Sequence, residues 1–313
     1  MSKKQRWFFG VLAGLIILWG ALFAPPVSSP ADQLITLTAG QSVTEVSLDL
    51  AETKIIKWPF IFRLAIFFTS RQNLVVAGDY HFSQPVNVWR VAWRLARGEY
   101  DLTSIKVTLP EGVAVKEMAE ILTAALPKFD TATFTAAALP LEGRLFPDTY
   151  FFQPTVTAAE VIKRLQTNFQ EKIEPLAPML AESGRTLEQI IIMASLVEKE
   201  AATPATRQTI AGILWKRLDT GMPLQVDAVF PYIIDKNTFE VNRRDLATSS
   251  PYNTYRFRGL PEGPITNPGL AAITAVLNPI ETDYWYYLSD YSGQIHYAAD
   301  FDAHRANKAR YLP

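Results

Sequence analysis

Two glutamates at the end of one apolar segment carry the strongest chemical signal in the sequence. Residues 190–197 are almost entirely apolar, and Glu198, Lys199 and Glu200 follow directly. Carboxylates at the end of a buried helix face the negative end of the helix dipole, which disfavours ionisation and raises their pKa. A carboxyl group with a raised pKa suits general acid catalysis near neutral pH. The segment therefore predicts acid catalysis by a glutamate.

Only one of the two glutamates is expected to be the acid. Positions 198 and 200 lie about 200° apart on a helix, so a single helix cannot aim both side chains at one substrate atom. Glu198 shares its face with Ala194 and Ser195, whose small side chains leave room for a ligand. This favours Glu198. On this segment alone, the alternative that both glutamates are solvated or ion-paired helix-end charges stays open.

The helix that carries these glutamates has a recognisable start. Thr186 and Gln189 form a capping box, which predicts a helix over residues 187–201. Thr203 as N-cap and Pro204 at the first helical position predict a second helix directly afterwards.

Three segments downstream supply polar groups beside this helix pair. Residues 224–227 are expected to form a strand with Gln225 and Asp227 on one face, where both can hydrogen-bond sugar hydroxyls. Residues 249–255 combine polar, aromatic and proline residues, and residues 259–269 combine proline, glycine and amide residues, as binding loops on a rigid scaffold do. Turn formation without any ligand is the alternative for both loops.

The N-terminal segment predicts export from the cytoplasm. Residues 7–24 carry no charge, follow three cationic residues and precede two prolines. This length is about the minimum that spans a bilayer core of roughly 30 Å. The preceding cations place the N-terminus in the cytoplasm and the rest of the chain outside. A cleaved signal peptide is the alternative, although its apolar core is usually only roughly 7 to 15 residues long.

The exported part has the pattern of the α+β class. Strand, helix, helix, strand, helix and strand patterns follow one another over residues 33–109, and a longer mixed helical and strand region follows. Residues 60–68 are very apolar, but their short length and the central Arg63 predict a core or interfacial helix rather than a membrane span.

Composition excludes several classes of function. The chain has 30 Lys and Arg against 31 Asp and Glu, so it has no basic footprint for nucleic acid. It has no cysteine, which excludes disulfides and thiolate chemistry. No His and Glu spacing matches a metal site and no glycine-rich phosphate loop occurs, so we expect no cofactor and no metal.

Five motifs, in this order, resemble the endolytic murein transglycosylases of the YceG-like (MltG) family. They are EGRLFPDTY at 142–150, ASLVEKEA at 194–201, MPLQVD at 222–227, SPYNTY at 250–255 and GLPEGPITNPG at 259–269. The resemblance implies a cytoplasmic N-terminus, single transmembrane helix and linker over residues 1–31. It further implies a small LysM-like α+β module over 32–108 and a larger mixed α/β catalytic domain over 109–313.

The resemblance also implies a reaction and a place in the cell. Cleavage of the β-1,4 bond between N-acetylmuramic acid and N-acetylglucosamine would leave a 1,6-anhydro end and terminate or trim nascent strands. The catalytic domain would face the periplasm from the inner membrane, with glycan strands as substrate and cell-wall synthases as partners. Glu198 occupies the catalytic position; the expected substrate-positioning residues are Glu200, Gln225, Asp227, Tyr252, Asn253, Tyr255 and Asn267.

Two other functions remain as alternatives at this point. An inverting muramidase would use Glu198 with Asp227 and add water to the product. A non-catalytic peptidoglycan-binding or synthase-scaffolding protein would need neither carboxyl group.

Overall fold

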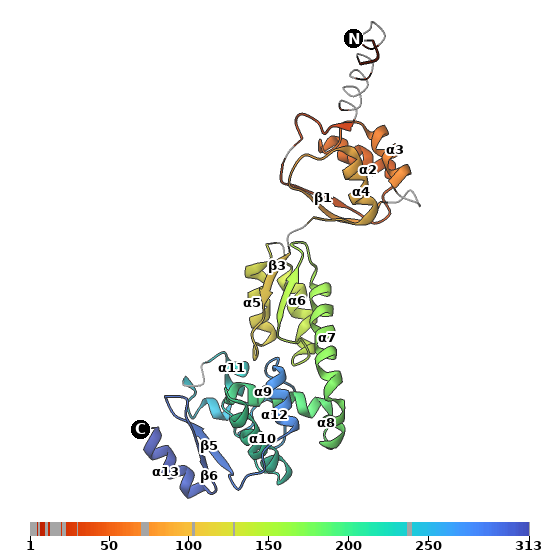
Figure 1. Cartoon of the computed structure of the whole chain (residues 1–313). Coiled ribbons are helices and arrows are strands. Elements are labelled where there is room, and N and C mark those ends of the chain that lie inside the picture. The colour runs from red at the N-terminus through yellow and green to blue at the C-terminus, as the bar shows by residue number, and fades with distance from the viewer. Residues whose placement is uncertain are drawn as a thin grey trace. The chain divides into compact units, whose positions relative to one another are not determined.

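The protein divides into two compact units, residues 1–103 and 104–313. The computed structural model describes residues 31–69, 75–101, 104–127, 129–236 and 240–312, together with some of the first 30 residues (Figure 1). Among these described residues, one hydrophobic core lies in the first unit and two lie in the second.

The first unit is a small α+β module. In the described residues between 31 and 101, strands β1 and β2 pair antiparallel, with Ile35 opposite Tyr80, and three helices accompany them. Its elements are β1 (Gln33–Leu37), α2 (Val43–Glu52), α3 (Pro59–Thr69), β2 (Gly78–Phe82) and α4 (Val88–Arg97). These match the first five of the six elements expected over residues 33–109, whereas the sixth, the strand at residues 105–108, belongs to the second unit. Ser42 caps α2 through a complete capping box, and Gly98 ends α4 at φ 68°, where its missing Cβ removes the steric cost.

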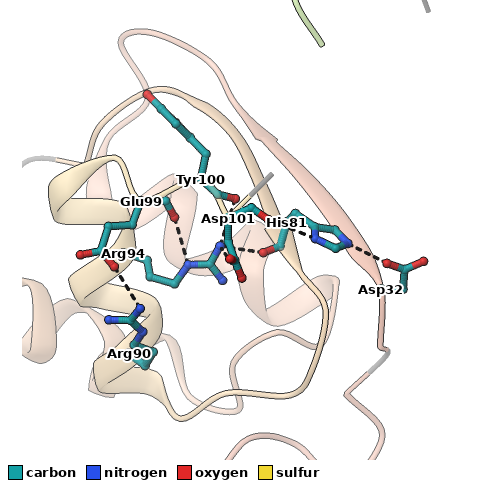
Figure 2. A network of polar contacts seen from close by, with 7 residues as sticks. All are labelled: Asp32, His81, Arg90, Arg94, Glu99, Tyr100 and Asp101. Carbon is teal, nitrogen blue, oxygen red and sulfur yellow. Dashed lines mark hydrogen bonds and ion pairs between the residues drawn. The ribbon is translucent and has the colours of Figure 1, made fainter. Parts of the chain in front are cut away.

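A buried arginine ties α4 to the strand and loop beside it, as Figure 2 shows. Arg94 is only 3% exposed. Its guanidinium donates hydrogen bonds to the backbone carbonyls of His81 (2.6 Å), Glu99 (3.0 Å) and Tyr100 (3.0 Å). The Asp101 carboxylate lies 3.8 Å away. Because the carbonyls satisfy the buried donors, this charge holds the end of the module in one conformation.

The second unit contains the two expected helices and both downstream loops. Its elements are β3 (Ile105–Thr108), α5 (Val115–Ala125), α6 (Thr131–Ala138), β4 (Thr149–Phe152), α7 (Ala158–Ile173), α8 (Ala177–Glu182), α9 (Leu187–Glu200), α10 (Pro204–Asp219), α11 (Val229–Ile234), α12 (Leu270–Leu277), β5 (Tyr286–Ser289), β6 (Ile295–Ala298) and α13 (Phe301–Tyr311). The pairs β3–β4 and β5–β6 are both antiparallel.

The centre of the second unit is helix α9. All eight residues from Ile190 to Val197 are buried, as the apolar run predicted. Helices α10 and α12 pack against α9, and residues from all three helices share one core (Figure 1). A separate core lies among α5, α6, α7 and the β3–β4 pair.

The sequence-based fold class is confirmed as mixed α+β, with one local correction. The strand expected at residues 224–227 is wrong, because Gln225 takes a left-handed backbone conformation at φ 52°. In the described part of the chain, no helix has the length and apolar character of a membrane span. Most of the predicted anchor at residues 7–24 lies outside the described residues.

Candidate active site

The two glutamates lie where the helix ends. Thr186 and Gln189 form the expected capping box at the start of α9, and Glu200 is its last residue. Thr203 caps α10 and Pro204 begins it. These local signals fix where α9 stops, and therefore where both carboxyl groups lie.

Glu198 is held in a buried ion pair. One carboxylate oxygen contacts the Arg207 guanidinium, and the other accepts the Gly269 backbone N–H at 2.9 Å. The Arg207 side chain also donates to the Ala201 carbonyl at 2.8 Å. Only 5% of the Glu198 side chain and 10% of the Arg207 side chain are exposed. Both oxygens of Glu198 therefore have donors within the protein.

Burial and two partners act in opposite directions on Glu198. Burial raises the pKa of Glu198 above its usual value, and the Gly269 N–H and the Arg207 charge oppose this increase without cancelling it. The nearby Glu111 carboxylate adds to the increase. A cation and a backbone donor both favour the ionised form, so protonating Glu198 would give up two charge-assisted hydrogen bonds.

Two glycines allow loops to close over Glu198. A Cβ on Gly112 would lie 3.1 Å from the Glu198 Cγ, and a Cβ on Gly269 would lie 1.9 Å from a Glu111 carboxylate oxygen. The two loops are joined where the Gly112 N–H donates to the Asn267 carbonyl at 2.9 Å. A side chain at Gly269 would displace Glu111, and one at Gly112 would crowd Glu198.

Glu200 lies in a different environment. Its neighbours are the Asp227 carboxylate, the Tyr287 hydroxyl and the Ala228 backbone N–H. Burial, followed by the charge of Asp227, raises the pKa of Glu200 to about 7, against the opposing hydrogen bonds from Tyr287 and Ala228. A carboxyl group with this pKa is partly protonated at neutral pH and can give up a proton there.

Asp227 is fixed by a tyrosine from the second predicted loop. The Tyr255 hydroxyl donates to an Asp227 carboxylate oxygen at 2.5 Å. Burial raises the pKa of Asp227, and the Tyr255 hydrogen bond and Lys308 oppose this increase. Asp227 and Glu200 are thus two carboxyl groups that disfavour each other's ionisation.

The segment before α11 presents polar groups to solvent despite forming no strand. Gln225 and Asp227 are exposed, whereas Leu224 and Val226 are buried. The segment is anchored by Thr254, whose carbonyl accepts the Gln225 N–H at 3.2 Å and whose hydroxyl accepts the Val226 N–H at 2.9 Å. Gln225 and Asp227 are therefore both at the surface, although no strand aligns their side chains on one face.

Asn267 is completely buried, and its side chain holds segments of the protein together. Its side-chain oxygen accepts the Leu145 N–H at 3.0 Å, and its amide donates to the Val113 carbonyl at 3.1 Å and to Glu142 at 2.6 Å. Glu142 in turn accepts the Val115 N–H at the start of α5. The amide therefore joins three segments of the second unit, which differs from the substrate contact expected from the sequence.

Asn253 is also completely buried. Its amide donates to the carbonyls of Leu246 (3.0 Å) and Thr248 (2.8 Å), and its side-chain oxygen accepts the backbone N–H groups of Tyr255 and Arg256. This side chain shapes the loop that delivers Tyr255 to Asp227, in place of the substrate contact expected from the sequence.

Tyr252 stands at the edge of the same loop. It is half-buried, and its ring centre lies 5.0 Å from that of Tyr232. A surface pocket opens in the two downstream loops beside it, lined by Ser249, Ser250, Pro251, Phe257, Leu260 and Glu262. An exposed aromatic edge next to a pocket is suited to contact with a sugar ring.

The structure brings Glu200, Asp227 and Tyr255 together, with Gln225 beside Asp227 at the surface. Sequence reasoning missed two contributors. Arg207 lies within the predicted second helix, and a cation nine residues after a glutamate is the only signal it offers. Tyr287 lies in β5, far along the chain, and no spacing points to it.

Comparison with known proteins places this arrangement in a family. The model of the YceG-like family matches residues 35–310. The chain belongs to the YceG-like family. An endolytic murein transglycosylase of Bacillus subtilis (strain 168) is 27% identical, over 96% of this chain and 91% of the relative. One from Streptococcus pneumoniae (strain D39) is also 27% identical, over 92% of this chain and 60% of the relative.

A solved structure shares the fold of this YceG-like chain. The crystal structure of a yceG-like protein from Listeria monocytogenes aligns with a TM-score of 0.60 and 27% identity. The alignment covers 88% of this chain and 99% of the Listeria protein.

Proposed function

We propose that this chain is a peptidoglycan transglycosylase that cuts glycan strands internally. Its membership of the YceG-like family and the name of its Bacillus and Streptococcus relatives, endolytic murein transglycosylase, support the proposal. A carboxyl group with a raised pKa suits acid-catalysed cleavage of a glycosidic bond, and burial raises the pKa of both Glu198 and Glu200.

Glu200 is the proposed acid, in place of Glu198, which the sequence favours. The observation that carries this choice is the contrast between their partners. Glu198 is paired with Arg207 and the Gly269 N–H, which favour its ionised form and oppose the increase in pKa that burial causes. Glu200 faces the like charge of Asp227, which favours its protonated form. Asp227 and Gln225 next to Glu200 are exposed residues, so a glycan strand can reach these three residues from solvent.

In the proposed reaction, Glu200 donates its proton to the oxygen that links N-acetylmuramic acid to N-acetylglucosamine. The bond from this oxygen to C1 breaks, and the muramyl 6-hydroxyl attacks C1. Its proton passes to the Glu200 carboxylate, which regenerates the acid. No water is consumed, so one essential carboxyl group is sufficient. The glycan strand is positioned by Gln225, Asp227, Tyr252 and Tyr255.

Mass spectrometry of digested glycan strands tests this reaction. We expect muramyl ends that are lighter by one water than the ends a muramidase leaves. The carboxylate of Asp227 is the group that an inverting hydrolase would use to activate water. Hydrated ends would therefore assign the chain to that second class. Absence of cleavage by the folded full chain would favour a non-catalytic role in binding or scaffolding.

The cellular setting belongs to the same proposal. The uncharged run at residues 7–24 supports a single membrane anchor with the N-terminus in the cytoplasm and both units in the periplasm. A LysM-like role for residues 32–108, a contribution to terminating or trimming nascent strands, and contact with cell-wall synthases follow the family resemblance. A reporter fused after Pro313 that is active only in the periplasm tests the orientation.

A further inference from the structure

Helix α3 in the first unit is apolar on two opposite sides. Phe62, Ala65 and Ile66 form its buried side within the core of the unit. The opposite side, called here the α3 outer face, is exposed to solvent. It consists of Phe60 (64% exposed), Leu64 (38%), Phe67 (62%) and Phe68 (68%).

The α3 outer face is a continuous patch. Its four positions fall within about 100° of one another around a helix of 3.6 residues per turn. A helix at a solvated surface normally carries polar residues on this side. Trp58, just before the helix, is also 49% exposed. A patch of large apolar side chains of this kind marks a contact surface.

Charge around the α3 outer face favours an anionic lipid surface. Residues 53–69 contain Lys54, Lys57 and Arg63 and no acidic residue. The Lys57 ammonium lies 5.5 Å from the centre of the Trp58 ring. Aromatic and basic residues in combination are typical of the layer between lipid headgroups and acyl chains. A basic patch is also attracted to anionic headgroups.

The α3 outer face is continuous with the end of the predicted anchor. The ring of Phe23, near the end of the uncharged run at 7–24, lies 5.7 Å from the ring of Trp89. Phe68 of the α3 outer face lies 6.3 Å from the same tryptophan. The face therefore begins beside the point where the anchor would leave the bilayer.

We propose that the α3 outer face lies in the outer interfacial layer of the membrane, with its aromatic side chains among the lipids. This inference rests on the membrane anchor of the proposed function. It gives the first unit a lipid-binding role separate from peptidoglycan chemistry, and the apolar composition of α3 is then explained by two partners, the protein core and the bilayer.

Single-cysteine labelling tests the proposal, because the chain has no cysteine of its own. The full chain is reconstituted in vesicles of phosphatidylethanolamine and phosphatidylglycerol and carries one nitroxide label, at Phe67→Cys or Phe68→Cys. A label at Phe151→Cys is the matched control, since Phe151 is 69% exposed in the second unit. Electron paramagnetic resonance then compares collisions with oxygen, which concentrates in lipid, and with a water-soluble nickel complex.

We expect the ratio of oxygen to nickel collisions to be several-fold higher at both α3 positions than at Phe151. A ratio equal to that at Phe151 would overturn the proposal. Shielding of the α3 labels from both reagents would also overturn it, because it would indicate a protein partner. A label at Leu12→Cys separates the causes of failure. Lipid contact at Leu12 without lipid contact at Phe67 would contradict the proposal for the α3 outer face alone. Absence of lipid contact at both positions would contradict the membrane anchor as well.

Discussion

Replacing Asn267 by alanine is expected to destabilise the second unit by about 3–5 kcal/mol. The substitution leaves the buried Leu145 N–H without an acceptor, at a cost of about 1–3 kcal/mol. It also removes a hydrogen bond to the Glu142 carboxylate, and such charged bonds contribute about 1.5–3 kcal/mol. The Val113 carbonyl still accepts the backbone N–H of residue 267, so losing its hydrogen bond from the side chain adds little to the destabilisation.

Hydrogen exchange read by mass spectrometry measures this change within one unit of a two-unit chain. The most protected amides of α9 report the free energy at which the second unit opens. A loss of 3–5 kcal/mol corresponds to about 10²- to 10⁴-fold faster exchange at these amides. Asn307→Ala is the control, because its amide makes a single hydrogen bond to the Tyr297 carbonyl, and we expect a loss of about 1 kcal/mol or less.

Wild-type exchange rates in Asn267→Ala, together with a loss of affinity for glycan strands, would contradict this prediction. This result would return Asn267 to the substrate contact that the sequence predicted, and it would mean that the three segments it joins are held by other interactions.

Three further substitutions test other parts of the site. Asp227→Asn removes a charge that raises the pKa of Glu200, so the fall in kcat/KM with rising pH should move below about 7; a pH–rate profile measures the shift. Arg207→Ala leaves Glu198 buried without its cation, and calorimetry should show a loss of about 3–5 kcal/mol. Gly143→Ala should cost about 2–4 kcal/mol, because a Cβ there adds left-handed strain to close contacts.

The glycine prediction has a control of matched backbone conformation. Gly143 has φ 82°, and its added Cβ would lie 2.5 Å from Pro264 and 2.7 Å from Ile191. Gly221 has φ 71° and open space around it. Gly221→Ala should therefore cost only about 1–2 kcal/mol. Equal losses for the two variants would show that packing against Pro264 contributes nothing.

Local signals allowed most elements near the site to be predicted from the sequence. The capping box of Thr186 and Gln189 and the Thr203–Pro204 pair placed the ends of α9 and α10, because caps act between residues that are close in the chain. The apolar run before Glu198 predicted a buried helix because no side of it was left polar.

Long-range partners could not be predicted in this way. Which glutamate is ion-paired depends on Arg207 and on a loop that returns to the end of α9 at Gly269. The like charge that raises the pKa of Glu200 comes from Asp227, which lies in another segment. These contacts follow from tertiary packing, whereas the sequence could compare only the helix faces of the two glutamates.

The asparagines show a second limit. Asn253 and Asn267 lie in loops rich in proline, glycine and aromatic residues, which predict exposed turns or binding loops. Both are buried instead, because each amide satisfies backbone groups that a loop in the protein interior leaves without partners. Gln225 similarly takes a left-handed conformation that no neighbouring residue type indicates.

The identity of the acid is tested most directly by comparing Glu200→Gln with Glu198→Gln on purified glycan strands. Cleavage is followed by chromatography and mass spectrometry, with hydrogen exchange to confirm that each variant is folded. We predict that Glu200→Gln lowers the cleavage rate by about 10²- to 10⁴-fold and that folded Glu198→Gln still cleaves. Cleavage at the wild-type rate by Glu200→Gln, together with an inactive but folded Glu198→Gln, would contradict the account.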